Sequence, residues 1–213
     1  MKNNFHRLTL ITNKGELPTQ AYLKFVELCV NAGVTCVQLR EKLLSRKKLL
    51  YFGQSLKNLL DLNNIPLIIN DHIDLCVQLN AAGVHLGQSD GDPIKARSIL
   101  GSSKLIGLSV NTLQQVQSSN FLPLDYIGIG AIFPTKNKFD IETIWGVAGL
   151  KKALKIAAHP IIAIGGINEN NIFSVINCGV QGVAAIGAFH DAADPYLATK
   201  KLITIINEVN NAG

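Results

Sequence analysis

The chain has 213 residues, of which 47% are hydrophobic and 16% are charged, and this composition excludes a largely disordered protein. The formal net charge of +5 suits nucleic acid, an anionic membrane or an anionic small molecule. The basic runs 46–48, 151–155 and 200–201 lie in expected surface helices without interleaved aromatic residues, which argues against nucleic acid.

Eight short apolar runs rich in β-branched residues recur along the chain, and all but the first end on polar, charged or glycine residues. The runs are 8–12, 37–42, 68–71, 84–90, 106–111, 127–138, 161–166 and 183–188. Helical periodicity fills most of the intervals, which is the βα alternation of a parallel sheet. Eight such units predict one (β/α)8 TIM barrel spanning 1–213, with its chemistry at the C-terminal ends of the strands.

The helices between these runs are indicated by apolar stripes and by capping residues. We expect helices over 18–32, after Ser45, from Asp71 to about Asn80, after Asp92-Pro93, around 172–176 and after Asp194-Pro195. The segment 133–147 is the longest without clear periodicity and is a candidate binding loop.

Targeting and redox features are sparse. No segment approaches a membrane span, and the apolar stretch near the start is too short for a signal peptide. The four cysteines have no C-x-x-C spacing and are expected to be small core residues in a reducing compartment. We therefore expect a cytoplasmic protein without a membrane partner.

Two acidic residues end neighbouring predicted strands. Asp71 and Asp90 follow the third and fourth runs, so their carboxylates are expected at one rim, close enough to share a hard cation. Mg²⁺ is usually held by one or two carboxylates together with substrate phosphates and water. Both residues also suit helix N-caps, and that alternative stays open at this point.

Cationic residues are expected beside these acids. Arg40 and Lys42 end the second run, and Lys138 follows the sixth. Each lysine taken singly suits a solvated rim position. Together with the acids the three cations favour a bound polyanion such as a diphosphate.

A second anion site is indicated on the far side of the predicted barrel. Gly165-Gly166 and Gly187 follow the seventh and eighth runs, where barrels commonly bind phosphate through backbone N–H groups. Ordinary βα turns are the alternative, and Thr135 adds a possible hydroxyl donor. No histidine pairs with a serine or cysteine in a recognisable nucleophile motif, so acyl transfer is not predicted.

Six motifs in order resemble the thiamine-phosphate synthase family. They are Q-L-R-E-K at 38–42, I-I-N-D at 68–71, G-V-H-L-G-Q-S-D at 83–90, I-G-L-S at 106–109, G-A-I-F-P-T-x-x-K at 130–138 and A-I-G-G-I at 163–167. The resemblance implies a (β/α)8 transferase. Such an enzyme joins 4-amino-5-hydroxymethyl-2-methylpyrimidine diphosphate to 4-methyl-5-(2-hydroxyethyl)thiazole phosphate with Mg²⁺.

The resemblance also implies roles for individual residues. Those implied for the pyrimidine diphosphate are Gln38, Leu39, Arg40, Glu41, Lys42, Asn70, Ser109 and Lys138, among which Arg40, Lys42, Ser109 and Lys138 are the expected catalytic set. Asp71 and Asp90 are the implied Mg²⁺ ligands. Those implied for the thiazole phosphate are Thr135, Lys136, Asn137, Gly166, Ile186 and Gly187.

Four positions depart from the family pattern. Asn137 and Gly187 stand where the family usually has Thr and Ser, Asn111 where it has His, and Asn13 where it commonly has Asp. Two alternatives are a thiazole tautomerase, which relies on a histidine in the region of Asn111, and a non-catalytic barrel that binds thiazole phosphate. Neither accounts for the full set of acids and cations at the rim.

Overall fold

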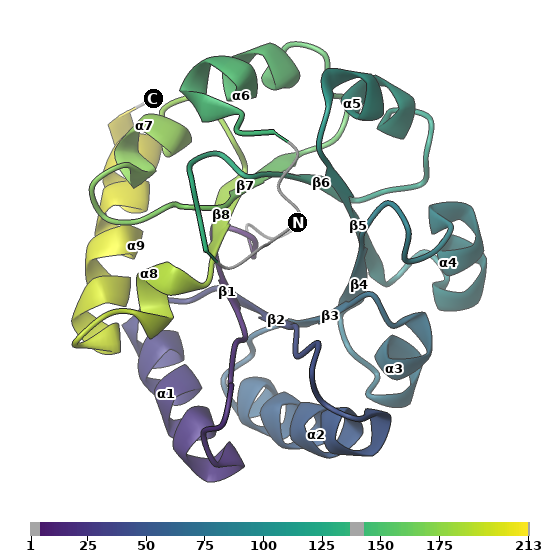
Figure 1. Ribbon diagram of the computed structural model, residues 1–213, viewed down its shortest axis with the longest axis vertical. Coiled ribbons are helices and arrows are strands. Elements are labelled where there is room, and N and C mark those ends of the chain that lie inside the picture. The colour runs from purple at the N-terminus through teal and green to yellow at the C-terminus, as the bar shows by residue number, and fades with distance from the viewer. Residues whose placement is uncertain (1–4, 137–142, 213) are drawn as a thin grey trace.

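The structure is a computed structural model that describes residues 5–136 and 143–212, in which eight strands form a ring inside a layer of helices (Figure 1). The strands are β1 (Leu8–Ile11), β2 (Cys36–Leu39), β3 (Leu67–Asn70), β4 (Gly83–Leu86), β5 (Leu105–Val110), β6 (Tyr126–Ile129), β7 (Ile161–Ile164) and β8 (Gly182–Ala185). The helices are α1 (Thr19–Ala32), α2 (Arg46–Leu62), α3 (Ile73–Gln78), α4 (Pro93–Leu100), α5 (Leu113–Ser119), α6 (Gly146–Leu154), α7 (Ile172–Ile176), α8 (Gly187–His190) and α9 (Pro195–Ala212).

The strands pair in parallel and in chain order, and the sheet closes between β1 and β8. The predicted (β/α)8 TIM barrel is therefore confirmed. Because every strand runs the same way, all eight C-terminal ends meet at one rim, and the loops that follow them surround it.

Alternation along each strand sorts side chains into two layers. The outward-facing residues, such as Leu10, Val37 and Ile69, pack with the helices in the main hydrophobic core. The inward-facing set is smaller and more polar, because polar residues such as Gln38 and His85 share the interior with a small apolar cluster that includes Ile11 and Ile162.

Two of the predicted N-caps are made by their side chains. Asp92 accepts from the backbone N–H of Ile94 at 2.8 Å and is followed by Pro93 at the first helical position. Asp194 accepts from the backbone N–H of Leu197 at 3.0 Å. Ser45 stands at the N-cap of α2, but its hydroxyl makes no capping hydrogen bond.

The helix expected to start at Asp71 begins later, at Ile73, and that prediction was wrong. Asp71 has a φ of +68°, in the left-handed region. Its backbone N–H donates to the carbonyl of His85 at 2.8 Å, so the chain still follows the barrel at this residue and cannot yet turn into a helix.

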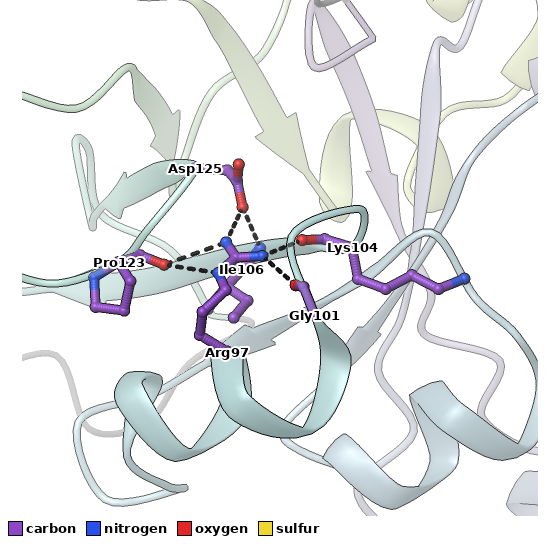
Figure 2. A network of polar contacts seen from close by, with 6 residues as sticks. All are labelled: Arg97, Gly101, Lys104, Ile106, Pro123 and Asp125. Atoms are coloured by element: carbon purple, nitrogen blue, oxygen red, sulfur yellow. Dashed lines mark hydrogen bonds and ion pairs between the residues drawn. The ribbon is translucent and has the colours of Figure 1, made fainter.

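At the N-terminal ends of the strands, Arg97 of α4 ties the connection into β5 to the approach to β6 (Figure 2). Its guanidinium donates to the carbonyls of Gly101 and Lys104 at 2.8 and 2.6 Å and to that of Pro123 at 3.2 and 3.3 Å, and it pairs with Asp125 at 2.5 Å. The same carboxylate accepts from the backbone N–H of Ile106 at 2.9 Å. The network therefore joins α4, β5 and the approach to β6, far from the rim that carries the loops.

All four cysteines are free thiols. Cys29, Cys36 and Cys76 are buried as expected, whereas Cys178 is only partly buried, so the expected core position is wrong for it. Among the described residues, no helix combines the length and the hydropathy needed to cross a membrane.

Candidate active site

A cavity of about 1000 Å³ opens at the C-terminal rim and reaches down into the barrel. Most of the residues predicted for the site line it. They are Gln38, Arg40, Lys42, Asn70, Asp71, Asp90, Ser109, Thr135, Lys136, Gly166, Ile186 and Gly187. Residues far apart in sequence are thus brought to one cavity, with the acids and Arg40 and Lys42 over β2 to β4 and the glycines over β7 and β8.

Asp71 and Asp90 form a close pair of acids within this cavity. The pKa of Asp71 is raised to about 6, chiefly by burial and then by a hydrogen bond with Asp90 and by its charge, whereas Lys42 and His72 act in the opposite direction. Neither residue caps a helix, because α3 has His72 and α4 has Asp92 at the N-cap. The N-cap alternative is therefore excluded. The pair shares a hydrogen bond while one group is protonated, and the two carboxylates repel each other once both are ionised.

A cation between the two carboxylates would relieve that repulsion. Among the residues that the structure describes, no group of three or more His, Cys, Asp or Glu side chains gathers into a metal site. The described part of the cavity thus offers a cation this pair of carboxylates rather than a full set of protein ligands. Such a donor set fits Mg²⁺, which commonly takes its remaining ligands from substrate phosphate and water.

The first residue after β2 is fixed by its backbone. The N–H of Arg40 donates to Oγ1 of Thr12, a fully buried residue, at 2.9 Å. Arg40 and Lys42 both line the cavity and present positive charge on the same side as the acidic pair. This part of the cavity combines a pair of carboxylates that can bind a cation with two basic side chains that can bind an anion. A metal-bound polyanion requires both.

Gly166 allows two loops to approach closely on the other side. Its φ is +66°, and a Cβ there would lie 2.6 Å from the carbonyl oxygen of Pro134 and 2.7 Å from Cβ of Phe133. The neighbouring backbone is held by the N–H of Phe133, which donates to the carbonyl of Gly165 at 3.0 Å. The glycine thereby fixes the segment that carries Thr135 against the end of β7.

Ile186 and Gly187 continue this wall at the end of β8, where the short helix α8 begins. Across the rim, Lys136 lies 3.4 Å from Oδ2 of Asp191, and both side chains are exposed. Lys136 therefore has an anionic partner in the protein itself, which an incoming phosphate would have to displace.

Two predicted residues do not present side chains to the cavity. Leu39 is 1% exposed and packs in the core outside the barrel. Glu41 turns toward the preceding loop, where its Oε1 accepts from the backbone N–H of Lys14 at 2.8 Å. Asn137 and Lys138 lie outside the described residues.

A histidine and a tyrosine that the sequence analysis left aside lie inside the site. Nε2 of His85 is 2.8 Å from Oγ of Ser109, and its Nδ1 is 3.0 Å from Oη of Tyr126. The sequence shows no histidine and serine in a recognisable nucleophile motif, yet the fold brings His85 and Ser109 into hydrogen-bond contact. The register places Gly107 between His85 and Tyr126, and a Cβ at Gly107 would lie 2.2 Å from the Tyr126 ring.

Acyl transfer is still not supported by this pair. Ser109 is bonded to His85, but Nδ1 of the histidine meets a phenol whose pKa is raised by burial, rather than a carboxylate that would stabilise an imidazolium. The arrangement instead fixes the position of the Ser109 hydroxyl at the cavity wall.

Comparison with known proteins identifies the family. A family model described as thiamine monophosphate synthase matches residues 8–189. The chain belongs to the thiamine monophosphate synthase family. It is 52% identical over 207 residues to the thiamine-phosphate synthase of Chlamydia abortus, covering 97% of this chain and 98% of the relative. It is 41% identical over 205 residues to that of Vibrio parahaemolyticus, covering 96% of this chain and all of the relative.

A solved structure agrees with this assignment. Thiamine phosphate pyrophosphorylase from Pyrococcus furiosus superposes with a TM-score of 0.87 at 32% identity, covering 97% of this chain and 98% of the other. As a member of the thiamine monophosphate synthase family, the protein is an enzyme, a transferase of thiamine biosynthesis.

Proposed function

We propose that the protein joins 4-amino-5-hydroxymethyl-2-methylpyrimidine diphosphate to 4-methyl-5-(2-hydroxyethyl)thiazole phosphate, forming thiamine phosphate and releasing diphosphate. The observation that carries the proposal is the division of one cavity into two unlike anion sites. One side holds Asp71 and Asp90 beside Arg40 and Lys42, and the other is built from glycine-rich backbone.

The pyrimidine diphosphate is assigned to the first side. Asp71 and Asp90 would hold Mg²⁺, whose chemistry when bound is to offset the charge of the diphosphate oxygens. Arg40 and Lys42 add fixed positive charge where the leaving group accumulates negative charge, which is electrostatic stabilisation of the transition state. Gln38, Asn70 and Ser109 line the same side and are suited to bind the polar edges of the substrate.

The thiazole phosphate is assigned to the second side, at Gly166, Ile186, Gly187 and Thr135. Backbone N–H groups at the ends of β7 and β8 are the usual phosphate donors in this type of barrel. The absence of the family's usual serine at position 187 leaves these backbone donors in place.

The bond changes balance without a general base. The bond from the pyrimidine methylene carbon to oxygen breaks and its electron pair leaves with the diphosphate. The lone pair of the thiazole nitrogen then forms the new carbon–nitrogen bond. We propose that the positive charge on the methylene carbon is shared with the pyrimidine ring, so that leaving-group departure is the step the site assists.

The residues of the cavity fit a thiazole tautomerase or a non-catalytic thiazole phosphate carrier less well. A thiazole tautomerase needs a proton-transferring group near the thiazole, and Asn111, where the resemblance expects a histidine, cannot supply one. A non-catalytic thiazole phosphate carrier has no need of the acidic pair or of Arg40 and Lys42.

The test is to mix both substrates with Mg²⁺ and to measure thiamine phosphate and diphosphate together. Asp71→Asn removes one charge while keeping a residue that tolerates the left-handed backbone, so it should abolish turnover without unfolding the protein. Asp74→Asn is the matched control, because Asp74 is exposed and pairs with Arg46 outside the cavity. No product from the wild-type protein, or equal activity of the two variants, would refute the proposal.

A further inference from the structure

The helix α8 needs support from outside itself. It spans only Gly187–His190, which is too short for a helix to be stable on its own. Yet it starts beside Ile186 and Gly187, whose backbone forms part of the cavity wall at the end of β8. Any tilt of α8 would move these two residues directly.

A chain of hydrogen bonds connects α8 to α1 behind this wall. Nδ1 of His190 is 2.8 Å from the carbonyl oxygen of Ile186, and its Nε2 is 2.7 Å from Oη of Tyr22. The backbone N–H of Asn13, after β1, donates to the same Oη at 3.0 Å. These hydrogen bonds thus link the end of β1 to the end of β8 through the side chains of Tyr22 and His190.

The geometry permits one arrangement of protons. A carbonyl oxygen only accepts, so Nδ1 of His190 carries the proton and Nε2 is the acceptor. Tyr22 must then donate its hydroxyl proton to Nε2, and its oxygen accepts from Asn13. Every donor meets an acceptor when His190 is neutral, whereas an imidazolium would leave the hydroxyl proton of Tyr22 unsatisfied.

The surroundings favour the neutral form of His190, which is half-buried. Tyr22 is fully buried, and its ring packs against Phe25 and Phe52 with centroid distances of 5.3 and 5.7 Å. The His190 ring is stacked near Tyr22 at 5.8 Å. Burial raises the pKa of Tyr22 and lowers the pKa of His190, and both directions favour the neutral forms that the hydrogen bonds require.

We propose that Tyr22 and His190 are positioning residues that hold Ile186 and Gly187 in the geometry that binds the phosphate of the thiazole substrate. The inference rests on the proposed function, which assigns that phosphate to the end of β8. Neither Tyr22 nor His190 lines the cavity, so both act through the backbone of Ile186.

Tyr22→Phe is the first test, because it removes the hydroxyl and keeps the ring. We expect the KM for thiazole phosphate to rise by about threefold to tenfold, the range that loss of one neutral hydrogen bond produces. The kcat and the KM for pyrimidine diphosphate should stay near the wild-type values. Phe25→Leu is the matched control, since Phe25 packs against both rings without a hydrogen bond and should lower stability while leaving both KM values unchanged.

His190→Gln distinguishes the contribution of the hydrogen bonds at Tyr22 and Asn13 from that of the hydrogen bond to Ile186. Its amide can still accept from Tyr22, so the Asn13 side is preserved. The imidazole donor to the Ile186 carbonyl is lost, which leaves that oxygen with the backbone N–H groups of Phe189 and His190 at 3.1 Å. This variant should raise the KM for thiazole phosphate as Tyr22→Phe does, and His190→Asn, which places an amide donor near the position of Nδ1, should restore part of the affinity. If only Tyr22→Phe has an effect, the effect arises at Asn13 and the inference is wrong.

Hydrogen exchange makes the test independent of the reaction. Amides of 187–190 should exchange faster in Tyr22→Phe and His190→Gln than in wild-type protein and Phe25→Leu. Unchanged exchange would overturn the inference even in an active enzyme. If the wild-type protein makes no thiamine phosphate but the two variants still exchange faster, the support of α8 by Tyr22 and His190 stands and the proposed function is rejected.

Discussion

Replacing Gly166 with alanine should weaken the binding of thiazole phosphate, because the new side chain displaces the neighbouring loop. The new Cβ would lie 2.6 Å from the carbonyl oxygen of Pro134 and 2.7 Å from Phe133, both on the segment that leads to Thr135. Restoring an ordinary contact of 3.4 Å requires this backbone to retreat by about 0.8 Å. A misplacement of about 1 Å can cost about 10²-fold in rate, so we expect the KM for thiazole phosphate to rise between tenfold and a hundredfold.

The stability effect of the same change can be separated from this loss of affinity. A non-glycine residue at φ +66° costs about 1–2 kcal/mol, or a few degrees in Tm for a chain of this size. Gly179→Ala is the matched control, because Gly179 has a φ of +95° and a Cβ added there would meet no atom of the described residues within 4 Å. It should lower Tm without changing either KM.

The assay is steady-state turnover with one substrate saturating and the other varied, alongside thermal unfolding. Gly166→Ala should leave the KM for pyrimidine diphosphate close to that of the wild-type enzyme. A Gly166→Ala enzyme with a normal KM for thiazole phosphate would show that the loop does not form that site. Loss of pyrimidine diphosphate binding alone would show that the two anion sites are assigned in reverse.

Three further predictions concern the metal, the sixth loop and acid stability. Asp90→Ala, or excess EDTA, should abolish turnover while circular dichroism stays that of the folded protein; full activity in EDTA would reject Mg²⁺. Lys138→Ala should lower kcat by about 10²-fold, as loss of one charge-stabilising group does, and Lys136→Ala far less, so equal effects would contradict the assignment. Burial lowers the pKa of His6 from 6.5 to about 3, so the unfolded chain binds a proton that the folded chain does not, and stability falls as the pH drops through this range. The loss at pH 4 should be about 3 kcal/mol. The urea midpoint of wild type should therefore fall between pH 7 and pH 4 by more than that of His6→Gln, and equal falls would contradict the reasoning.

The barrel could be predicted because its signals are local. Each strand is a short apolar run, and all but the first run end on polar, charged or glycine residues, so eight repeats indicate closure without any knowledge of contacts. The start of α3 could not be predicted in the same way. The N-D-H sequence at 70–72 is typical of a helix start, but a hydrogen bond from Asp71 to His85 on the next strand holds the backbone in the sheet.

Residues of the candidate site also differ in whether a local sequence signal predicts their place. The family motif at 38–42 predicts one block of binding residues, although period-two alternation indicates that Gln38, Arg40 and Lys42 share one face while Leu39 and Glu41 share the other. The structure follows that alternation. The bond between His85 and Tyr126 has no such local signal, because it depends on the register of three strands.

The Arg97 network has a consequence for how loops of different length are tolerated. Arg97 donates to the carbonyls of Gly101 and Lys104, between α4 and β5, and to that of Pro123, between α5 and β6. One guanidinium therefore constrains the length of both connections. Inserting a residue within 101–104 would draw at least one carbonyl out of reach and leave a partly buried charge underbonded. These two connections, into β5 and into β6, are therefore held to a fixed length, whereas Arg97 sets no such limit on the loops at the opposite rim.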